Sequence, residues 1–222
     1  MELYEAMRTT FAAREFTDEA IADEVLYRIL DNARFAPSGG NRQGGRVIVV
    51  RDAATRERMA QLIAPPARRY AAQANVGENP WNTVEPTRLS DAEILQTAVP
   101  SRLIDPILRA PVVLVVCVDL SVVASMDQYL DRVGITSGAS VYPLVWNILL
   151  AARNEGYGGV LTTFLTAAEP EAKRLLELPA EIAIAAVVPL GRPVKQLTKL
   201  NRKPVQDFVA RERWGGQPFT AA

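Results

Sequence analysis

The stretch APSGGNRQGGR, residues 36–46, joins an amphipathic helical pattern on one side to an apolar strand pattern on the other. Four of its eleven residues are glycine, and most of the others carry hydrogen-bond donors or acceptors. Because glycine lacks a Cβ, the backbone amides of such a segment can approach a ligand closely. The composition fits a binding loop, although ordinary helix-to-strand turns are glycine-rich as well.

Helical and strand patterns alternate on both sides of this loop. Apolar residues recur at helical spacing from Asp23 to Ala33, whereas Arg46–Val50 is a β-branched run typical of a buried strand. The Val/Leu run Pro111–Asp119 predicts a central strand, and Ile182–Leu190 predicts another. Further helices are predicted at Glu2–Phe11, Ala53–Ala64, Val141–Glu155, Glu169–Leu176 and Val205–Arg213, with an irregular or short extended piece at Val160–Leu165. These patterns predict an α+β fold, or a mixed α/β sandwich, in which helices flank a central mixed sheet of about four strands.

Length and composition restrict the class of protein. The chain has 222 residues, 49% hydrophobic and 23% charged, which suits one domain over residues 1–222. Its 25 basic and 25 acidic residues cancel, so binding to nucleic acid or to an anionic membrane surface is not favoured. The chain has no histidine, which argues against a metal site and against Ser-His or Cys-His catalysis, and no catalytic side chain is nominated.

Two apolar segments bear on where the protein resides: one contains the single cysteine, and the other is long enough to be considered as a membrane span. The single cysteine, Cys117, lies inside an apolar run and is expected to be a buried hydrophobe in a reducing cytoplasm. Residues Val133–Ala152 are uncharged and long enough to cross a bilayer, but their polar and glycine residues favour a buried helix instead. The helix at Val141–Glu155 is apolar all round, so it should be buried in the domain centre or against a second subunit.

Prolines interrupt the middle of the chain. Residues 65–110 contain repeated prolines around a polar loop at Asn75–Thr87, which predicts short helical pieces in a lid-like excursion from the domain. Tyr70 and Trp81 within it are either aromatics that cover a ligand or anchors that hold the excursion on the domain.

Four motifs in order along the chain resemble those of the FMN-dependent nitroreductase family. They are the loop Ala36–Gln43 with Arg14–Thr17 upstream, the segment Gly156–Thr163 after the helix Asn147–Arg153, Leu190–Pro193, and Arg202–Val205. Without the resemblance, the glycine-rich turn would be read as a helix C-cap at Gly158. The matches run from about residue 7 to residue 214, and the proline-rich middle matches least.

The resemblance implies a nitroreductase-like, intertwined homodimer with an FMN site at the subunit interface. It implies that hydride passes from NAD(P)H through the flavin to a nitroaromatic, quinone or similar acceptor, the redox chemistry belonging to the cofactor. The residues that it assigns to the cofactor are Arg8, Thr10, Arg14, Pro37, Ser38, Gly39, Asn41, Gln43, Leu161, Thr162, Thr163, Lys199 and Arg202. Tyr70 and Trp81 are the candidate substrate residues, and they are chosen for their place in the proline-rich segment rather than from the resemblance.

The chain departs from the family pattern at two places. Thr10, Phe11 and Ala12 stand where an arginine and a serine are usual, so the phosphate is held either by Arg8 and Thr10 or chiefly by Arg14 and Arg202. Gly44 and Gly45 replace the usual Pro-Trp after Gln43, which bears on substrate preference more than on flavin binding.

Three other functions are compatible with the sequence. The same fold could carry out a different flavin reaction, namely dehalogenation or cleavage of the flavin itself. The chain could also be a flavin-binding module without turnover, or a structural or interaction domain. A yellow protein that NAD(P)H does not bleach identifies the binding module, and a colourless protein identifies the structural domain.

Overall fold

The run expected to form a central strand is β2 (Val112–Asp119), which lies in the middle of a four-stranded sheet. The computed structural model describes residues 1–221. The strand order is β1-β2-β4-β3, with β1 at Gly45–Val50, β4 at Ile182–Gly191 and β3 at Gly158–Gly159. All neighbouring strands pair antiparallel, and a parallel contact occurs at the isolated bridge between Ala12 and Gly159.

Alternate residues of β2 face two separate cores. Leu114 and Val116 pack with the first core, and Val113 and Val115 pack with the second, as the two-residue period of a strand requires. Cys117 lies in the second core, where burial raises the pKa of its thiol to about 11. The thiol therefore stays protonated at neutral pH, which confirms its role as a buried hydrophobe.

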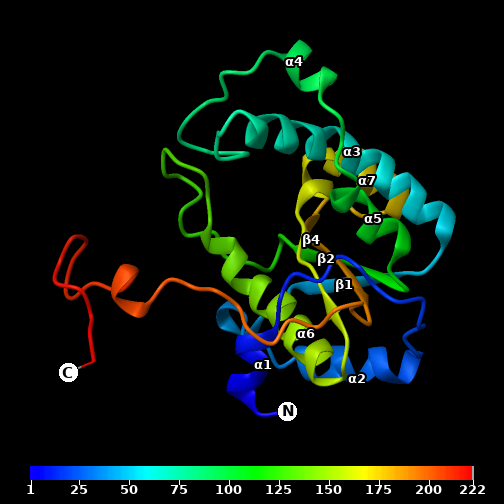
Figure 1. The fold of residues 1–222 in the computed structure, drawn as a ribbon, viewed down its shortest axis with the longest axis horizontal. Coiled ribbons are helices and arrows are strands. Elements are labelled where there is room, and N and C mark those ends of the chain that lie inside the picture. Colours follow the sequence, from blue (N-terminus) through cyan, green and yellow to red (C-terminus); the bar gives the residue numbers. More distant parts are fainter. Residues whose placement is uncertain (222) are drawn as a thin grey trace.

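Helices cover both faces of the sheet (Figure 1). The first face packs against α2 and α6, through residues such as Ile29 and Ile148. The second face packs against α3, α5 and α7, through residues such as Ile63 and Ile107. The helices are α1 (Leu3–Thr9), α2 (Asp23–Ala33), α3 (Ala53–Asn75), α4 (Asp91–Gln96), α5 (Ser101–Arg109), α6 (Tyr142–Asn154) and α7 (Glu169–Leu176). Short 3-10 helices are η1 (Gly39–Asn41), η2 (Thr136–Ser140), η3 (Phe164–Ala168) and η4 (Val205–Asp207). The predicted α+β class with about four strands is confirmed, but the prediction of a mixed sheet is wrong, because all neighbouring strands pair antiparallel.

The fourth strand is a pair of glycines that sequence patterns do not identify as a strand. A Cβ on Gly159 would lie 2.5 Å from the carbonyl oxygen of Pro189, so only glycine allows β3 to approach β4 this closely. The interpretation of Gly158 as a helix C-cap is wrong, because Gly156 is the residue with positive φ (84°) after α6.

The helix predicted to end at Ala64 continues through Pro65 and Pro66 to Asn75. Each proline removes one helical hydrogen bond, a cost of about 3 kcal/mol in a helix interior. However, the buried positions Met59, Ile63 and Ala67 recur every four residues across the prolines and pack into the second core. Burial of this continuous face outweighs the lost hydrogen bonds, so the first part of the proposed 65–110 excursion is core helix.

The helix predicted at Val205–Arg213 is also wrong, since only the three-residue turn η4 forms there. The segment beyond Leu200 leaves the domain as an extended arm, drawn orange to red in Figure 1. Phe208 and Trp214 on this arm are exposed, because no apolar surface within residues 1–221 covers them. A short amphipathic segment without such packing has little to stabilise a helix.

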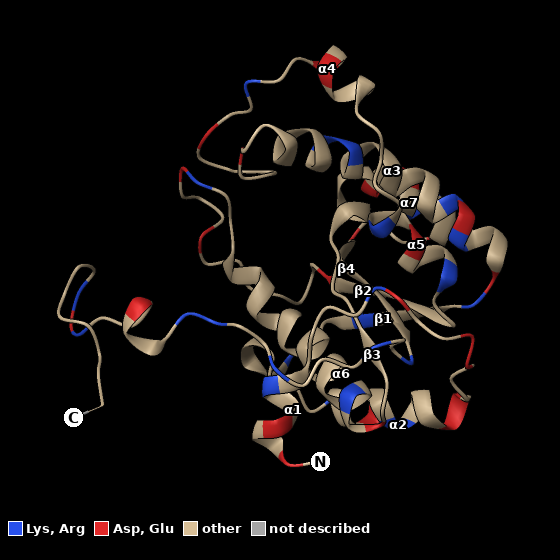
Figure 2. Cartoon of the chain, viewed as in Figure 1, with Lys and Arg blue, Asp and Glu red and all other residues tan. Residues whose placement is uncertain are grey.

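Charges of both signs are interspersed over the outer helices, while the arm before η4 is basic (Figure 2). None of the helices within residues 1–221 has the length and apolar character needed to cross a bilayer. Over the same residues, His, Cys, Asp and Glu side chains form no group of three that could hold a metal ion.

Candidate functional site

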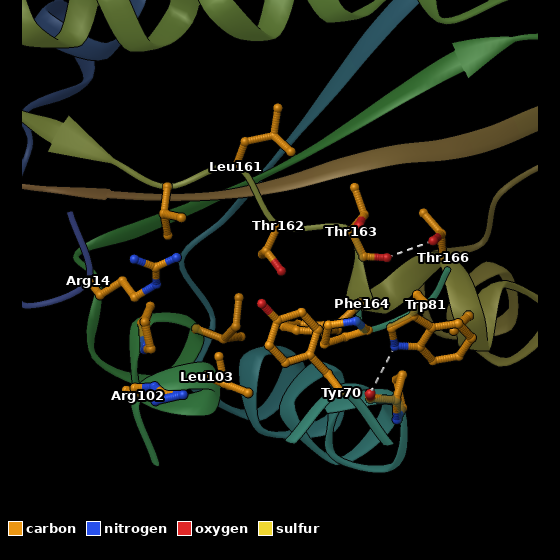
Figure 3. A pocket seen from close by; sticks show the side chains of 16 residues that line it. Arg14, Tyr70, Trp81, Arg102, Leu103, Leu161, Thr162, Thr163, Phe164 and Thr166 are labelled. Carbon is orange, nitrogen blue, oxygen red and sulfur yellow. Dashed lines mark hydrogen bonds between the residues drawn. The ribbon is translucent and has the colours of Figure 1, made fainter. Parts of the chain in front are cut away.

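A cavity of about 540 Å³ lies between the segment that follows β3 and the helices α3 and α5 (Figure 3). Leu161, Thr162 and Thr163 line one side of it, and Tyr70 and Trp81 line another. Arg14 lies at the end near Leu161 and Thr162. The cavity therefore brings together six of the fifteen residues proposed from the sequence, from four parts of the chain.

The backbone of the Leu161–Thr163 segment is held against β4. The amide of Thr162 donates to the carbonyl of Val187 (3.0 Å), and the amide of Val187 donates back to Thr162 (2.8 Å). The carbonyl of Thr163 accepts hydrogen bonds from the amide (3.0 Å) and hydroxyl (2.6 Å) of Thr166 at the start of η3. Within residues 1–221, the amides of Leu161 and Thr163 have no hydrogen-bond acceptor. The segment is thus fixed in place with two backbone donors left for a ligand.

Aromatic side chains form the wall across from this segment. Tyr70 and Phe164 meet edge to face, with ring centroids 5.5 Å apart and planes at 83°. The Trp81 amide donates to the buried side chain of Gln73 (3.1 Å), and the guanidinium of Arg69 lies 4.9 Å from the Trp81 ring centroid. Trp81 has a positive φ of 58°, which is unusual for a bulky residue and is held by these contacts.

Arg14 belongs to a segment that pairs with the end of the sheet. The amide of Thr17 donates to the carbonyl of Arg192 (2.9 Å), and the amide of Val194 donates to the carbonyl of Glu15 (3.1 Å). Two polar contacts that sequence patterns gave no reason to single out extend this pairing. The Gln196 side chain donates to the Thr9 carbonyl (3.1 Å), and Arg153 donates to the Thr9 hydroxyl (3.0 Å). Residues 9–17 and residues 192–196 therefore run side by side, which brings together the start of the chain and the segment that leads into the basic arm.

The other candidates for binding the phosphate, Arg8, Thr10, Lys199 and Arg202, lie outside the cavity. Thr10 is buried, and its hydroxyl donates to the carbonyl of Ala6 (2.7 Å). Arg8 and Lys199 are exposed, and Arg202 on the arm donates to the adjacent carbonyl of Asn201 (2.8 Å). None of these side chains lines the cavity in the single chain.

The glycine-rich loop also lies outside this cavity. Its shape is set by positive φ at Gly40, Asn41 and Gln43 and by the Ser38 hydroxyl, which accepts a hydrogen bond from the Gln43 amide (2.9 Å). The amide of Gly39 donates to the Ser140 hydroxyl in η2 (3.1 Å). Pro37, Gly39, Asn41 and Gln43 are exposed, so the loop presents polar groups at the surface near the start of α6.

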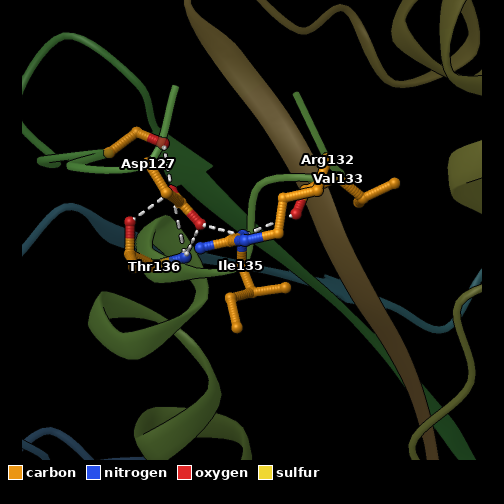
Figure 4. A network of polar contacts seen from close by, with 6 residues as sticks. Asp127, Arg132, Val133, Ile135 and Thr136 are labelled. Carbon is orange, nitrogen blue, oxygen red and sulfur yellow. Dashed lines mark hydrogen bonds and ion pairs between the residues drawn. The ribbon is translucent and has the colours of Figure 1, made fainter. Parts of the chain in front are cut away.

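A buried carboxylate orders the loop between β2 and η2 (Figure 4). Asp127 accepts hydrogen bonds from the Ile135 amide (2.7 Å), the Thr136 hydroxyl (2.5 Å), the Arg132 guanidinium (2.8 Å) and the Ser125 hydroxyl (3.3 Å). These donors, the Ile135 amide foremost, hold the pKa of Asp127 well below its usual range. The loop is fixed in shape although Met126, Tyr129 and Ile135 on it are exposed.

Comparison with known proteins gives consistent results. The model of the nitroreductase family matches residues 7–192. A protein of Thermus thermophilus named NADH dehydrogenase is 31% identical over 202 residues, which cover 88% of this chain and 89% of that protein.

Two solved structures share the fold. An oxidized iodotyrosine deiodinase bound to FMN and 3-iodo-L-tyrosine has a TM-score of 0.64 at 24% identity, covering 96% of this chain and 99% of that one. A BluB-like flavoprotein from Clostridium difficile 630 has a TM-score of 0.70 at 19% identity, covering 96% and 100%. Since the model of the nitroreductase family spans most of the chain, the protein belongs to that family.

Proposed function

We propose that the protein is an FMN-dependent oxidoreductase that uses NAD(P)H to reduce a nitroaromatic, a quinone or a similar acceptor. The observation that carries the proposal is the cavity in which Arg14 and the free amides of Leu161 and Thr163 lie across from an aromatic wall. Membership of the family, the name of the Thermus thermophilus relative and the FMN in the deiodinase structure support it.

The residues of the cavity fit a flavin. A flat aromatic ring system needs an apolar wall, a few convergent hydrogen-bond donors and a cavity of about 300–1,000 Å³, and the volume of about 540 Å³ lies in that range. The amides of Leu161 and Thr163 are donors toward ring nitrogen and oxygen atoms, and Arg14 brings a positive charge. The chemistry that FMN supplies when bound is two-electron transfer between NAD(P)H and the acceptor.

The protein's own contribution is binding and orientation. The Leu161–Thr163 segment fixes two donors with no reorganisation, because Thr162 is already paired with Val187. We propose that basic side chains hold the phosphate, as charge-assisted hydrogen bonds are needed to bind a dianion. Arg14 and Arg202 are the first candidates, and the pairing of Gln196 with Thr9 supports a convergence of the two ends of the chain. Arg8, Thr10 and Lys199 are the alternatives.

We propose that the protein acts as a homodimer. Tyr142 and Trp146 on α6 remain about two-fifths exposed, and the basic arm carries exposed aromatics, so both surfaces offer apolar area to a partner. A second copy would cover α6, and its loop at residues 37–43 would reach the cavity of the first. An obligate interface of this type should bury roughly 2,000 Å² or more.

We propose that residues 76–100 act as a lid over the acceptor, with Trp81 as its contact inside the cavity and Tyr70 of α3 as the second aromatic contact to the acceptor. The anchoring of Trp81 on Gln73 supports this, because it fixes one edge of the lid to α3. NAD(P)H is an intracellular reductant, which agrees with the cytoplasmic location expected from the single buried cysteine.

The test is the visible spectrum of the purified protein under nitrogen. We expect a yellow protein that NADPH or NADH bleaches and that 4-nitrobenzyl alcohol or a quinone restores. A yellow protein that neither nicotinamide bleaches would indicate a binding module, and a protein that stays colourless after incubation with FMN would refute the proposal.

Reductive dehalogenation is the second candidate, favoured by the similarity to the iodotyrosine deiodinase structure. Release of iodide from 3-iodo-L-tyrosine by the reduced protein, at a rate above that of nitro reduction, would identify it.

A further inference from the structure

Arg102 is a cationic side chain in the cavity that the proposed function has not used. It lies in the first turn of α5, beside Leu103, on the side of the cavity away from Leu161 (Figure 3). Within residues 1–221, its guanidinium makes no hydrogen bond and no ion pair. By contrast, Arg109 at the other end of the same helix lies 3.9 Å from Asp105 and does not line the cavity.

The cavity carries uncompensated positive charge. Arg14 and Arg102 line it, and no Asp or Glu among residues 1–221 does. The first turn of α5 adds a smaller positive potential. Its N-cap is Pro100, whose side chain has no acceptor for the free amides of that turn. Two guanidiniums in one cavity with apolar walls favour an occupant that carries negative charge.

The proposed cofactor accounts for Arg14 more readily than for Arg102. Arg14 comes from the segment that pairs with residues 192–194, next to the Leu161–Thr163 backbone where the flavin is proposed to lie. Arg102 comes from α5, which also carries Leu103, and both lie on the same side of the cavity as Tyr70, opposite Leu161 (Figure 3). A flavin on the Leu161–Thr163 segment would leave Arg102 facing the acceptor.

We propose that the acceptor is an aromatic compound that bears a carboxylate, with its ring against Tyr70 and Phe164 and its carboxylate on Arg102. The planar guanidinium can bind a carboxylate through two parallel N–H···O bonds, which a neutral substituent cannot match. This inference rests on the proposed function for the reaction, but recognition of the carboxylate can be measured without turnover.

The experiment compares 4-nitrobenzoate with 4-nitrobenzyl alcohol. Both undergo the same two-electron reduction, in which the nitro group takes two electrons and two protons from reduced flavin and solvent and becomes a nitroso group plus water. The probes therefore differ in the charge at the far end of the ring. The variants are Arg102→Gln, Arg102→Lys, and the matched control Arg109→Gln from the same helix.

We expect Arg102→Gln to lower kcat/KM for 4-nitrobenzoate about tenfold, mainly through KM, because one charge-assisted contact at an exposed side chain is lost. The ratio of kcat/KM for 4-nitrobenzoate to kcat/KM for 4-nitrobenzyl alcohol should fall by the same factor. Arg102→Lys should restore part of the preference for 4-nitrobenzoate, and Arg109→Gln should leave kcat/KM for both compounds unchanged. Calorimetric titration of 4-nitrobenzoate into the protein as purified should show the same loss of affinity.

Two results would overturn the inference. In the first, Arg102→Gln affects both probes equally or neither, while the protein still binds FMN and is bleached by NADPH. In the second, the loss appears to the same extent in the anaerobic bleaching step, which would assign Arg102 to the nicotinamide donor. If the wild-type protein binds no flavin, the proposed function fails, and the calorimetric comparison of Arg102→Gln with Arg109→Gln still decides whether Arg102 binds a carboxylate.

Discussion

Replacement of Arg14 by alanine should weaken FMN binding without unfolding the protein. Apart from a 3.3 Å hydrogen bond to the nearby carbonyl of Ala12, the Arg14 side chain has no partner within residues 1–221, so the fold does not depend on it. The backbone contacts of its segment, such as Val194 to Glu15, are left intact. A hydrogen bond from a charged group contributes about 1.5–3 kcal/mol. The loss should therefore raise the Kd of FMN about ten- to a hundredfold.

The assay is a titration of flavin into protein stripped of cofactor, followed by the quenching of flavin fluorescence. Arg202→Ala should give a loss of the same size, and Arg58→Ala, on an exposed part of α3 outside the cavity, is the matched control. Riboflavin lacks the phosphate, so its weaker affinity should barely respond to either substitution.

Two outcomes would contradict this reasoning. If Arg14→Ala and Arg202→Ala bind FMN as tightly as the wild type, the phosphate site lies elsewhere, and Arg8 or Lys199 becomes the candidate. If Arg14→Ala weakens riboflavin as much as FMN, the guanidinium binds the ring or the ribityl chain and the phosphate assignment is wrong.

Three further predictions concern the surroundings of the cavity. Trp146→Glu should convert a dimer into a monomer in sedimentation velocity and lower flavin content, whereas a stable, flavin-loaded wild-type monomer at micromolar concentration would refute the proposed dimer. Glu78 accepts hydrogen bonds from the Thr87 hydroxyl (2.7 Å) and the Arg88 amide (2.9 Å). Glu78→Ala should therefore speed proteolysis within residues 76–90 and change the KM of the acceptor. If the variant also loses FMN, the loop is not merely a lid. Because the pKa of Asp127 is depressed in the folded protein, its carboxylate stabilises the fold at pH values above the ordinary Asp pKa of about 3.9, and this stabilisation is lost as the pH falls through the folded-state pKa. The Tm difference between wild type and Asp127→Asn should therefore be constant above about pH 5 and shrink in stronger acid. A difference that shrinks toward neutral pH would contradict the assignment.

Hydrophobic patterning was sufficient to predict the strands that carry the core. The Val/Leu run of β2 and the runs of β1 and β4 each form a strand within a residue or two of the predicted ends. The prediction that the β1 run is buried is wrong, because β1 lies at the edge of the sheet and only its Val50 is buried. The failures have physical causes. Local rules placed the end of a helix at Pro65, but burial of Ala67 and its neighbours in the second core exceeds the penalty of the prolines. Strand β3 consists of two glycines, and its pairing depends on close approach to β4 rather than on any pattern.

The candidate site was predictable where a residue sits on a short, ordered segment. Arg14, Leu161, Thr162 and Thr163, named from the family resemblance, line one cavity with Tyr70 and Trp81, named from the proline-rich segment, and their roles stay predictions. Arg102 was missed because the proline-rich middle has no clear periodicity, although Ser101–Arg109 forms a helix with an apolar face toward the cavity. The loop at Pro37–Gln43 lies outside the cavity of its own chain, and the role proposed for it needs a second copy.

The pairing of residues 9–17 with residues 192–196 also bears on when the protein can acquire its cofactor. Thr9 and Gln196 are 187 positions apart, so the wall that carries Arg14 closes across nearly the whole chain. During synthesis, the amino-terminal segment can pair with Arg153 and Gly159 first, and its partners at residues 192–196 follow only after the last strand has left the ribosome. A nascent chain that stops before residue 192 lacks the pairing that holds Glu15 and Thr17 beside Arg14, so we expect stable cofactor binding to follow translation of the whole domain.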